Sequence, residues 1–577
     1  MKQVKLKIIL LTIILLGFFL RFYGINWDKS CCLHPDERAI VMFTTPLKLP
    51  VNISEFLSIT SPLNPHFFAY GSFPLYLLKS VMTFTGFINP VYASYQIGGV
   101  VGRNISIAAD LATLFLVFLI GKKLFDKKIG LFAAFFYSLS VFPIQASHFY
   151  AVDILLTFFI ILTLYQLIRF YENPSIKNSL FVGIFFGFAL ATKISAIPLI
   201  AAISFTITAD FILVFIKQPH KIKSWLPHLP RTVIKLIKDG FVISSATFLT
   251  FIVLEPYALI DFQEFLKQSL LQSQMTKNAF IFPYTLQYVG KIPYLYELKN
   301  VFLWGMGPVI ATFAFLGFLN FFYLVFKKET KAKDAKQIII FIFFIVYFLI
   351  VGKFAVGWMR YMLPLYPLLS IFAGMFIVTF LKPKLETIKN KIILNTLYLI
   401  LYTLTIVWPL SFIQIYTKPN TRITASEWIY KNIPPNSIIA KEHWDDGLPI
   451  GGTVPYQILE LPIYEIENPL REEQIYQTIQ KTNYIIIASN RLYVPLQRLS
   501  KNCRKWNLPQ ERCANNANKY YEKLFSGELG YKKVAEFTNY PKVPFTNIEI
   551  NDESADESFT VYDHPKIMIF KKISNKS

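Results

Sequence analysis

Two adjacent carboxylates, Asp36 and Glu37, stand shortly after an apolar run that covers residues 6–23. Pro35 disfavours helical structure at His34 and fits the first turn of a new helix. We expect both acidic side chains in that first turn, where the positive end of the helix dipole favours their ionised form. An ionised carboxylate at this place can accept a proton or bind a cation. An ordinary helix start has the same residues, so this alternative stays open.

Six further ionisable residues stand at the ends of apolar runs or interrupt them: Arg103, Asp110, His148, Asp153, Lys193 and Arg360. Because an ionisable side chain near lipid is costly, each is a functional candidate. Each also has a structural interpretation. Arg103 and Asp110 share one helix face and suit internal ion pairs. Asp153 suits a helix cap, and the other three suit polar tips that extend to the membrane interface.

Together these residues supply the groups for one kind of chemistry. Several carboxylates and cations gathered at one interface can hold a phosphate leaving group beside a general base. A phosphate at the interface, with its lipid tail between helices, is the natural ligand. The elements around these residues must therefore bring them to one side of a membrane.

The composition indicates a membrane protein that crosses the bilayer several times. Of the 577 residues 54% are hydrophobic and only 16% are charged, and the mean hydropathy is +0.43. The net charge of +22 is spread between the apolar runs. This pattern is typical of membrane orientation signals, so nucleic acid is not an expected partner.

The apolar runs predict a polytopic α-helical membrane protein of about 11 spans. The stretch 180–216 has 37 residues. As one helix it would measure about 55 Å against a hydrocarbon core of about 30 Å, so we place a break at Thr192 and Lys193. The predicted spans are 6–23, 99–121, 130–143, 154–170, 180–191, 195–216, 240–254, 301–326, 337–351, 363–381 and 392–412.

The charges of the connecting loops predict the orientation. Basic residues gather in every second loop, which places those loops and the amino terminus in the cytoplasm. The other loops are then external, including a long first loop at 26–98 whose segment 73–82 we expect to lie in the interface. The odd span count places the tail after Phe412 outside. The basic loops are 122–128, 169–177, 217–238, 327–336 and 382–391.

Six short motifs, taken together, resemble those of the GT-C glycosyltransferases. The resemblance is to bacterial relatives of the dolichyl-phosphate-mannose protein O-mannosyltransferases and of the lipid A aminoarabinose transferases. It rests on the order, spacing and sidedness of the motifs over about the first 410 residues. The motifs are His34–Glu37, Pro74–Tyr76, Arg103–Ser106, Ser147–Asp153, Gly187–Lys193 and Arg360–Pro364.

This resemblance implies a polyprenyl-phosphate-linked sugar as donor and transfer on the external face. It implies that Asp36 acts at the acceptor as base or cation ligand, with Glu37 beside it and Asp153 in support. Metal use differs within these families, so a divalent metal held by Asp36 and Asp153 stays open, and no other cofactor is implied. The implied phosphate contacts are Arg103, Lys193 and Arg360, with His34, His148 and Asp110 as further support.

The tail, residues 413–577, is predicted to be an external α/β domain that follows a membrane catalytic domain, residues 1–412. Its helices and apolar strands alternate, which is typical of a small α/β unit. The expected helices are 425–433 and 472–479, and the expected strands are 437–440, 484–488 and 566–570.

Two other features of the predicted external segments bear on chemistry. Trp444–Asp446 is similar to a nucleotide-sugar metal motif, but the membrane carboxylates already supply a site, so ordinary surface structure is favoured. All four cysteines, Cys31, Cys32, Cys503 and Cys513, fall outside. An oxidising exterior favours a disulfide between the last two, and no zinc-type spacing occurs.

Two functions of different classes remain open at this stage. The favoured one is a glycosyltransferase of a plasma membrane, of bacterial type, whose acceptor hydroxyl belongs to a protein, a lipid or a glycan. The alternative is a transporter or flippase of a lipid-linked or anionic substrate. A transporter predicts internal repeats and charges near the bilayer midplane. The sequence has no such repeat, and its charges fall at the outer face. Membrane lipids are the surrounding partners in either case.

Overall fold

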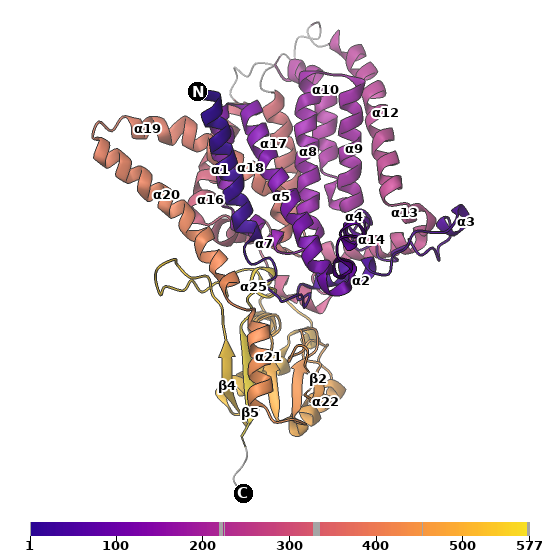
Figure 1. Cartoon of the computed structure of the whole chain (residues 1–577), viewed down its shortest axis with the longest axis vertical. Helices are drawn as coiled ribbons and strands as arrows, with labels where there is room; N and C mark the ends of the chain where they lie inside the picture. Colours follow the sequence, from indigo (N-terminus) through magenta and orange to yellow (C-terminus); the bar gives the residue numbers. More distant parts are fainter. Residues whose placement is uncertain (1, 218–222, 224–225, 327–334, 453, 574–577) are drawn as a thin grey trace.

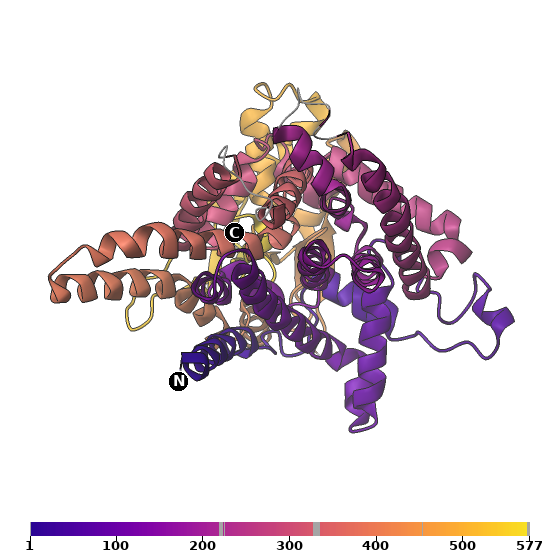
Figure 2. The same cartoon turned by 90° about the horizontal axis from the view of Figure 1, so that it is seen from above.

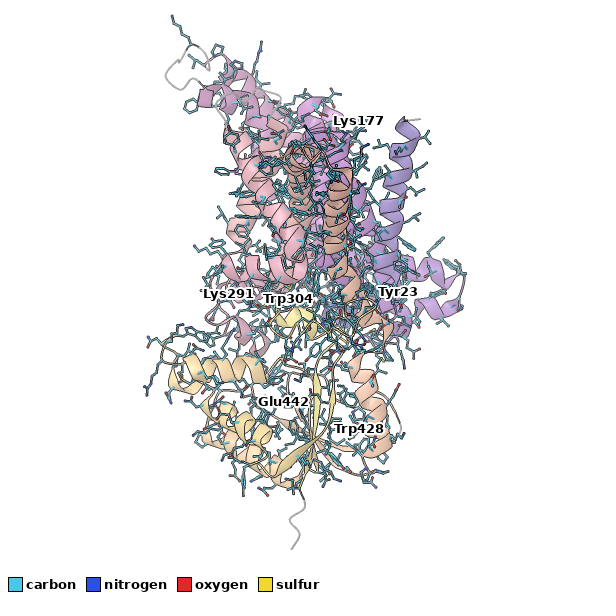
Figure 3. The ribbon with its side chains drawn as sticks, turned by 90° about the vertical axis from the view of Figure 1, so that its left-hand side faces the viewer. Tyr23, Lys177, Lys291, Trp304, Trp428 and Glu442 are labelled. Atoms are coloured by element: carbon cyan, nitrogen blue, oxygen red, sulfur yellow. A yellow bond between two sulfur atoms is a disulfide. The ribbon has the colours of Figure 1, made fainter. Side chains whose placement is uncertain are left out.

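The computed structural model describes residues 2–217, 223, 226–326, 335–452 and 454–573. Helices form a bundle at one end of the molecule, and a five-stranded sheet with flanking helices forms the other end (Figure 1). In Figure 3, Lys177 lies at the end of the bundle far from the sheet, whereas Tyr23 lies at the near end. The side of a membrane that each end faces stays a prediction. Among the predicted basic positions, Lys221, Lys327, Lys328, Lys331 and Lys333 lie outside the described residues.

The first 94 residues form one long helix and a loop that carries shorter helices. His34 caps the amino end of α2, Pro35 begins it, and both acidic residues lie in its first turn. The predicted helix start is thus confirmed. The elements are α1 (Lys2–Phe22), α2 (Pro35–Thr44), α3 (Ile53–Phe56), α4 (Phe73–Gly86) and the 3-10 turn η1 (Pro90–Ala93).

Every predicted apolar run contains a helix of the bundle. The chain also breaks at Lys193, which has an extended backbone between α9 and the next turn. The bundle helices after α1 are α5 (Tyr95–Leu124), α6 (Lys127–Ser138), α7 (Val141–Ser147), α8 (Val152–Glu172), α9 (Ile176–Thr192), α10 (Leu199–Lys217), α12 (His228–Leu254), α16 (Pro308–Phe326), α17 (Ala335–Val351), α18 (Tyr366–Phe376) and α20 (Lys391–Ile413).

Not all of these helices are long enough to span a membrane by themselves. By length and composition, five helical stretches of the described residues can cross a membrane, or six if α6 and α7, bent by 58°, form one span. Four shorter apolar helices accompany them, among them α9 and α17. The expected helical membrane architecture is therefore present, while the count of about 11 spans stays a prediction.

Short elements connect the bundle helices, most of them at the end that faces the sheet. The segment after α12 forms a helix, α14, that no sequence pattern predicted. In the view of Figure 2 the hairpin of α19 and α20 projects away from the other helices. These elements are η2 (Ile194–Ala196), α13 (Tyr257–Ile260), α14 (Phe262–Lys277), η3 (Pro283–Tyr288), α15 (Leu295–Asn300), η4 (Val301–Gly305), η6 (Met359–Leu365), η7 (Ile377–Leu381), α19 (Lys382–Glu386) and η8 (Gln414–Thr417).

A glycine fixes the first external loop against the break between α9 and α10. The Gly71 amide donates a hydrogen bond of 3.1 Å to the carbonyl of Thr192. A Cβ at position 71 would stand 1.8 Å from the carbonyl oxygen of Ala191. Because such an approach admits no side chain, glycine is required here. The contact holds the loop before α4 beside Lys193.

The carboxyl-terminal sheet has the strand order β2-β1-β3-β5-β4. β1 runs parallel to β2 and β3, whereas β5 is antiparallel to β3 and β4. The three predicted strands are confirmed as β1, β3 and β5, and both predicted helices as α21 and α22. The strands are β1 (Ile438–Glu442), β2 (Gln457–Leu461), β3 (Tyr484–Ile487), β4 (Tyr531–Phe537) and β5 (Ile567–Lys572). The helices and turns are α21 (Thr421–Asn432), α22 (Pro469–Lys481), α23 (Tyr493–Asn502), η9 (Gln510–Arg512), α24 (Asn515–Ser526) and α25 (Glu557–Thr560).

The segment before β5 joins the sheet to the bundle. Phe559 and Tyr562 belong to the apolar core of the bundle. The side chain of Gln145 on α7 donates a hydrogen bond of 2.7 Å to the carbonyl of Phe559, and the Tyr416 hydroxyl donates one of 2.8 Å to Asp563. A disulfide joins Cys503 and Cys513, as favoured from the sequence. The sheet region is therefore packed firmly against the loops at the near end of the bundle.

Candidate functional site

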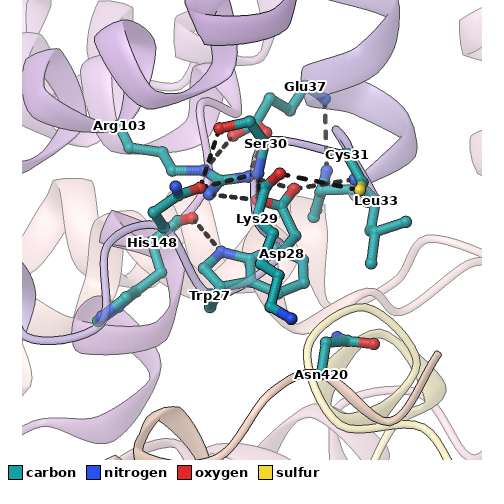
Figure 4. A network of polar contacts seen from close by, with 12 residues as sticks. Trp27, Asp28, Lys29, Ser30, Cys31, Leu33, Glu37, Arg103, His148 and Asn420 are labelled. Atoms are coloured by element: carbon teal, nitrogen blue, oxygen red, sulfur yellow. Dashed lines mark hydrogen bonds and ion pairs between the residues drawn. The ribbon is translucent and has the colours of Figure 1, made fainter. Parts of the chain in front are cut away.

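A buried ionic cluster forms around Arg103 of α5 and includes Asp28 from the segment that follows α1 (Figure 4). Its guanidinium donates hydrogen bonds of 2.9 and 2.6 Å to Glu37, and of 2.9 and 2.7 Å to Asp28. A further bond of 2.8 Å reaches the carbonyl of Ile25. All three charged side chains are at most 1% exposed. Burial opposes ionisation of Asp28, but Arg103 and backbone N–H groups still hold the pKa of Asp28 below its ordinary value.

This cluster has no capacity left for a ligand. A guanidinium has five N–H donors, and two carboxylates and one carbonyl engage the three nitrogens of Arg103. Glu37 also accepts a bond of 2.8 Å from the amide of Tyr150. Arg103 and Glu37, implied by resemblance to be a phosphate contact and a catalytic group, thus lie inside the protein.

Asp110 lies in a second internal network within the bundle. Its carboxylate forms an ion pair with Arg21 of α1 and accepts hydrogen bonds from the hydroxyls of Tyr137 and Ser147. Asp110 and Arg21 are both buried. The structural interpretation of Asp110 was an internal ion pair. The structure contains such a pair, and the partner is Arg21 of the neighbouring helix α1.

The two histidines named as supporting candidates, His34 and His148, serve packing. His34 caps α2 and packs against the rings of Phe149 and Tyr562, with centroids 4.5 and 4.1 Å away. His148 stacks on Tyr416 with a centroid distance of 4.0 Å, and its ring nitrogens contact two backbone carbonyls. Burial lowers the pKa of His34 well below its ordinary value, so the ring is neutral at pH 7.

The remaining candidates form one chain of alternating charges. Arg360 of η6 forms an ion pair with Asp36 at the start of α2. Its Nε atom also lies 3.9 Å from the carboxylate of Asp153 at the start of α8. Asp153 in turn accepts a hydrogen bond of 2.8 Å from Lys193, at the break after α9. Four elements far apart in the sequence thus place these four side chains together.

Aromatic rings border both cations of this chain. The Lys193 ammonium lies 4.9 Å from the ring centroid of Tyr361 and 5.7 Å from that of Tyr70. The Arg360 guanidinium lies 4.9 Å from the ring centroid of Trp358. Such contacts stabilise a cation in a partly desolvated place. The Nε atom of Arg360 is buried and has no hydrogen-bond partner among the described residues.

A cavity of about 470 Å³ adjoins these four charged side chains, and Asp153 and Lys193 form part of its wall. The first loop, the segment from η2 to the start of α10, the end of α12, α14, α17 with the loop after it, and η6 supply the rest. Its lining is Phe68, Ala69, Tyr70, Gly71, Asp153, Lys193, Ile194, Ser195, Ile197, Pro198, Glu255, Phe265, Ser269, Gln272, Ser273, Thr276, Lys277, Tyr347, Ile350, Val351, Phe354 and Tyr361.

Sequence reasoning named no role for several of these cavity residues. Glu255 is 1% exposed, and burial raises the pKa of its carboxyl group well above the ordinary value. Tyr70 and Tyr361 carry no local signal that separates them from other aromatic residues. The spacing of Phe262, Leu266 and Leu270, at every fourth position, was the one signal available for α14.

The charged residues do not fit a metal centre in this arrangement. Among the described residues no three His, Cys, Asp or Glu side chains converge as metal ligands would. Asp36 and Asp153, the ligands considered for a metal that the sequence left open, both face Arg360, which already supplies the positive charge between them. We therefore derive no step through a metal.

The Trp444–Asp446 stretch joins the sheet region to the first loop. Asp446 accepts two hydrogen bonds of 3.2 Å from Arg38 on α2 and lies 3.4 Å from Arg422. Asp445 accepts a hydrogen bond from Ser489. Both carboxylates are thus used in structural contacts, while the Trp444 ring is 44% exposed.

Part of the chain matches a known family, and the whole chain resembles solved structures. Residues 93–238 match the family model described as dolichyl-phosphate-mannose-protein mannosyltransferase. An oligosaccharyltransferase from Archaeoglobus fulgidus, solved with an inhibitory peptide and a dolichol-phosphate, has a TM-score of 0.51 at 13% identity over 99% of this chain and 89% of that chain. Its form tethered with an acceptor peptide has a TM-score of 0.50 at 12% identity over 98% and 88%. No curated protein matches the sequence.

A further structure is similar over somewhat less of this chain. ArnT from Cupriavidus metallidurans, bound to undecaprenyl phosphate, has a TM-score of 0.45 at 12% identity over 85% of this chain and 94% of that chain.

These findings define the fold of the protein. It is similar to that of the archaeal oligosaccharyltransferase, and the resemblance to the GT-C glycosyltransferases predicted from the sequence is confirmed. At 13% identity the structural likeness concerns the fold, and the family model covers only the segment from α5 to α12. The reaction must therefore be argued from the site.

Proposed function

We propose that the protein is a membrane glycosyltransferase that moves a sugar from a polyprenyl-phosphate donor to an acceptor hydroxyl on the external face. The observation that carries this proposal is the cavity with Lys193 and Asp153 in its wall and the Asp36–Arg360 pair beside it. It combines a general base, two cations and an enclosed space in a GT-C fold.

The two cations suit the phosphate of the donor. Lys193 has three N–H donors, of which Asp153 engages one. The Nε–H of Arg360 is buried and makes no hydrogen bond within the part of the chain that the structure describes, although the Asp153 carboxylate lies 3.9 Å away. A buried donor left unsatisfied costs about 1–3 kcal/mol, and a charge-assisted bond to a phosphate oxygen would remove that cost. The site thus has donors available on the two cationic side chains that a phosphate would need.

The apolar part of the cavity suits a lipid chain. Ile194, Ile197 and Ile350 line the cavity and are each more than 40% exposed. They come from the start of the α10 segment and from α17, so the cavity opens between these two elements. The dolichol-phosphate in the similar archaeal oligosaccharyltransferase supports a ligand of this class.

Asp36 is the group best placed to act on the acceptor. Its side chain is 18% exposed, whereas that of Glu37 is fully buried. In the proposed step Asp36 takes the proton of the acceptor hydroxyl, and the acceptor oxygen forms a bond to the anomeric carbon. The bond from that carbon to the phosphate oxygen breaks, and polyprenyl phosphate leaves with the electron pair. Lys193 and Arg360 stabilise the charge on the departing phosphate.

The acceptor side of the site borders the sheet region. Arg38, two residues after Asp36, binds Asp446 of that region. An acceptor that reaches Asp36 would therefore meet residues of the carboxyl-terminal part as well. We propose that this part forms an external domain which helps to bind the acceptor.

Transfer by the purified full-length protein tests this function. The protein in lipid nanodiscs would be incubated with a panel of undecaprenyl-phosphate sugars and candidate acceptors, and loss of donor would be followed by mass spectrometry. We expect acceptor-dependent loss of at least one donor, and none with Asp36→Asn. Movement of intact donor between leaflets of a vesicle, without loss of its sugar, would instead support a flippase.

A further inference from the structure

One wall of the cavity is polar in a regular pattern. Four uncharged polar residues of α14 line the cavity at the spacing i, i+3, i+4 and i+7, which places them on one face of the helix, and Phe265 and Lys277 of the same helix border them. We name this surface the polar face of α14, and it consists of Ser269, Gln272, Ser273 and Thr276. The exposed apolar residues Phe262, Leu266 and Leu270 lie outside the cavity lining.

The polar face of α14 has unused hydrogen-bonding capacity. The Oγ atom of Ser269 is buried and has no partner among the described residues. Thr276 donates to the carbonyl of Ser273 and keeps its lone pairs free. Within the described part of the chain, no hydrogen bond is recorded for the side chain of Gln272. Because buried polar groups are nearly always satisfied, the unpartnered Ser269 hydroxyl indicates a polar ligand, and the half-buried side chains of Gln272 and Thr276 can bind the same ligand.

Other contacts hold α14 in place at its middle and near its carboxyl end. Gln268 accepts a hydrogen bond of 2.6 Å from the amide of Phe68 in the first loop and donates one of 3.2 Å to the carbonyl of His66. Near the carboxyl end, the carbonyl of Thr276 accepts a bond of 2.6 Å from the amide of Ala355. The polar face is thus pre-organised rather than mobile, as a selective site requires.

The chemistry of this wall fits one part of the donor. A prenyl chain cannot satisfy hydroxyl and amide groups, and a phosphate prefers cations such as Lys193 to uncharged side chains. A sugar presents several hydroxyls, which such side chains bind, and an apolar ring face, which can pack on aromatic rings such as Tyr70 and Tyr361. We propose that the polar face of α14 holds the sugar of the lipid-linked donor and selects which sugar is transferred. This inference rests on the proposed function.

Binding measurements with two kinds of lipid test the inference. The probes are undecaprenyl phosphate without sugar and undecaprenyl phosphate loaded with a hexose, an N-acetylhexosamine or a pentose. The wild type, Gln272→Ala and Ser273→Ala would be compared in nanodiscs by native mass spectrometry. Gln263→Ala, on an exposed position of the same helix, is the matched control.

We expect the wild type to bind one loaded lipid more tightly than the bare phosphate. Loss of one hydrogen bond should weaken that loaded lipid by about 2- to 10-fold in Gln272→Ala and Ser273→Ala, with no change for undecaprenyl phosphate. Gln263→Ala should bind both lipids as the wild type does.

The outcomes separate this inference from the proposed function. If the wild type binds undecaprenyl phosphate but no loaded lipid more tightly, or if the two variants bind all lipids as the wild type does, the role of α14 is overturned while the proposed function stands. An equal weakening of both lipids would also overturn it, since the residues would then act on the phosphate or the chain. If no lipid binds to the wild type, the proposed function fails first.

Discussion

Asp36 and Glu37 are neighbours in the sequence, but their side chains leave α2 about 100° apart, as 3.6 residues per helical turn requires. Asp36 faces Arg360 beside the cavity, whereas Glu37 faces Arg103 inside the protein. The same rotation explains why the sequence could not separate their roles. Spacing along one helix shows which residues share a face, but not what the next element places opposite that face.

Removing the charge of Asp36 tests its role as the base. Asp36→Asn keeps the size of the side chain, so we expect folded protein in normal amount. Loss of a general base costs about 10²- to 10⁴-fold in rate, and turnover with a competent donor measures it. Turnover near that of the wild type would remove Asp36 from the catalytic step.

Glu37→Gln should act on stability rather than on the chemical step. Asp28 still balances the charge of Arg103 in this variant, but the hydrogen bonds between Glu37 and Arg103 are weakened, and hydrogen bonds to charged groups contribute about 1.5–3 kcal/mol each. We expect a clearly lower temperature of thermal unfolding in detergent. Glu427→Gln is the control, since its pair with Lys29 is more than half exposed and such pairs contribute about 0–1 kcal/mol. Equal unfolding temperatures for the two variants would contradict the structural role of Glu37.

At the scale of elements, the break between α9 and α10 places Lys193 at the cavity. Its position was predictable, because an uninterrupted helix from 180 to 216 would be longer than a membrane is thick. α14 was not predictable in the same way. It has polar residues on the cavity side and exposed apolar residues on a neighbouring face, so its pattern carries no clear core-facing stripe.

Lys193 should determine the affinity for the donor phosphate. Lys193→Met keeps the apolar stem and removes the charge, so the binding of undecaprenyl phosphate should weaken by about 10- to 100-fold. Lys193→Arg keeps the charge and should retain most of the binding. Lys48→Met, at an exposed position of the first loop, controls for a general change of charge. Unchanged binding in Lys193→Met would show that the side chain serves only its contact with Asp153.

At the scale of the whole molecule, β1, β3 and β5 were predictable because they are short apolar runs with buried residues. β2 and β4 were not, because they lie at the edges of the sheet and carry exposed glutamate and lysine side chains. Charged edge strands prevent pairing with other chains, and this removes the apolar signal that identifies a strand. Contacts between distant parts, such as Arg38 with Asp446, leave no sequence pattern at all.

The proposed orientation predicts opposite labelling at the two ends of the molecule. Lys481 in the sheet region and Lys177 at the far end of the bundle are both exposed. With Cys31→Ser as background, Lys481→Cys should react with a membrane-impermeant thiol reagent in intact cells. Lys177→Cys should react only after permeabilisation. The reverse pattern would place the cavity on the cytoplasmic face and contradict external transfer.

A buried histidine near the chain end should make the packing of the sheet region depend on pH. His564 lies between Asp552 and Asp563, at 2.9 Å and 2.5 Å, and all three side chains are buried. Burial lowers the pKa of His564, but the two carboxylates outweigh it and raise it to about 10. Asp563 also accepts hydrogen bonds from Gln145 of α7 and from Tyr416, whose ring packs in the apolar core of the bundle.

A histidine whose pKa is higher in the folded than in the unfolded chain stabilises the fold most below its ordinary pKa of about 6.5. This contribution is lost as the pH rises towards 10. We therefore expect the unfolding temperature of the wild type to fall between pH 7 and pH 10, and that of His564→Gln to be lower at pH 7 and to depend less on pH. Parallel pH profiles of the two proteins would show that His564 is neutral, and the two carboxylates would then need another source of compensating charge.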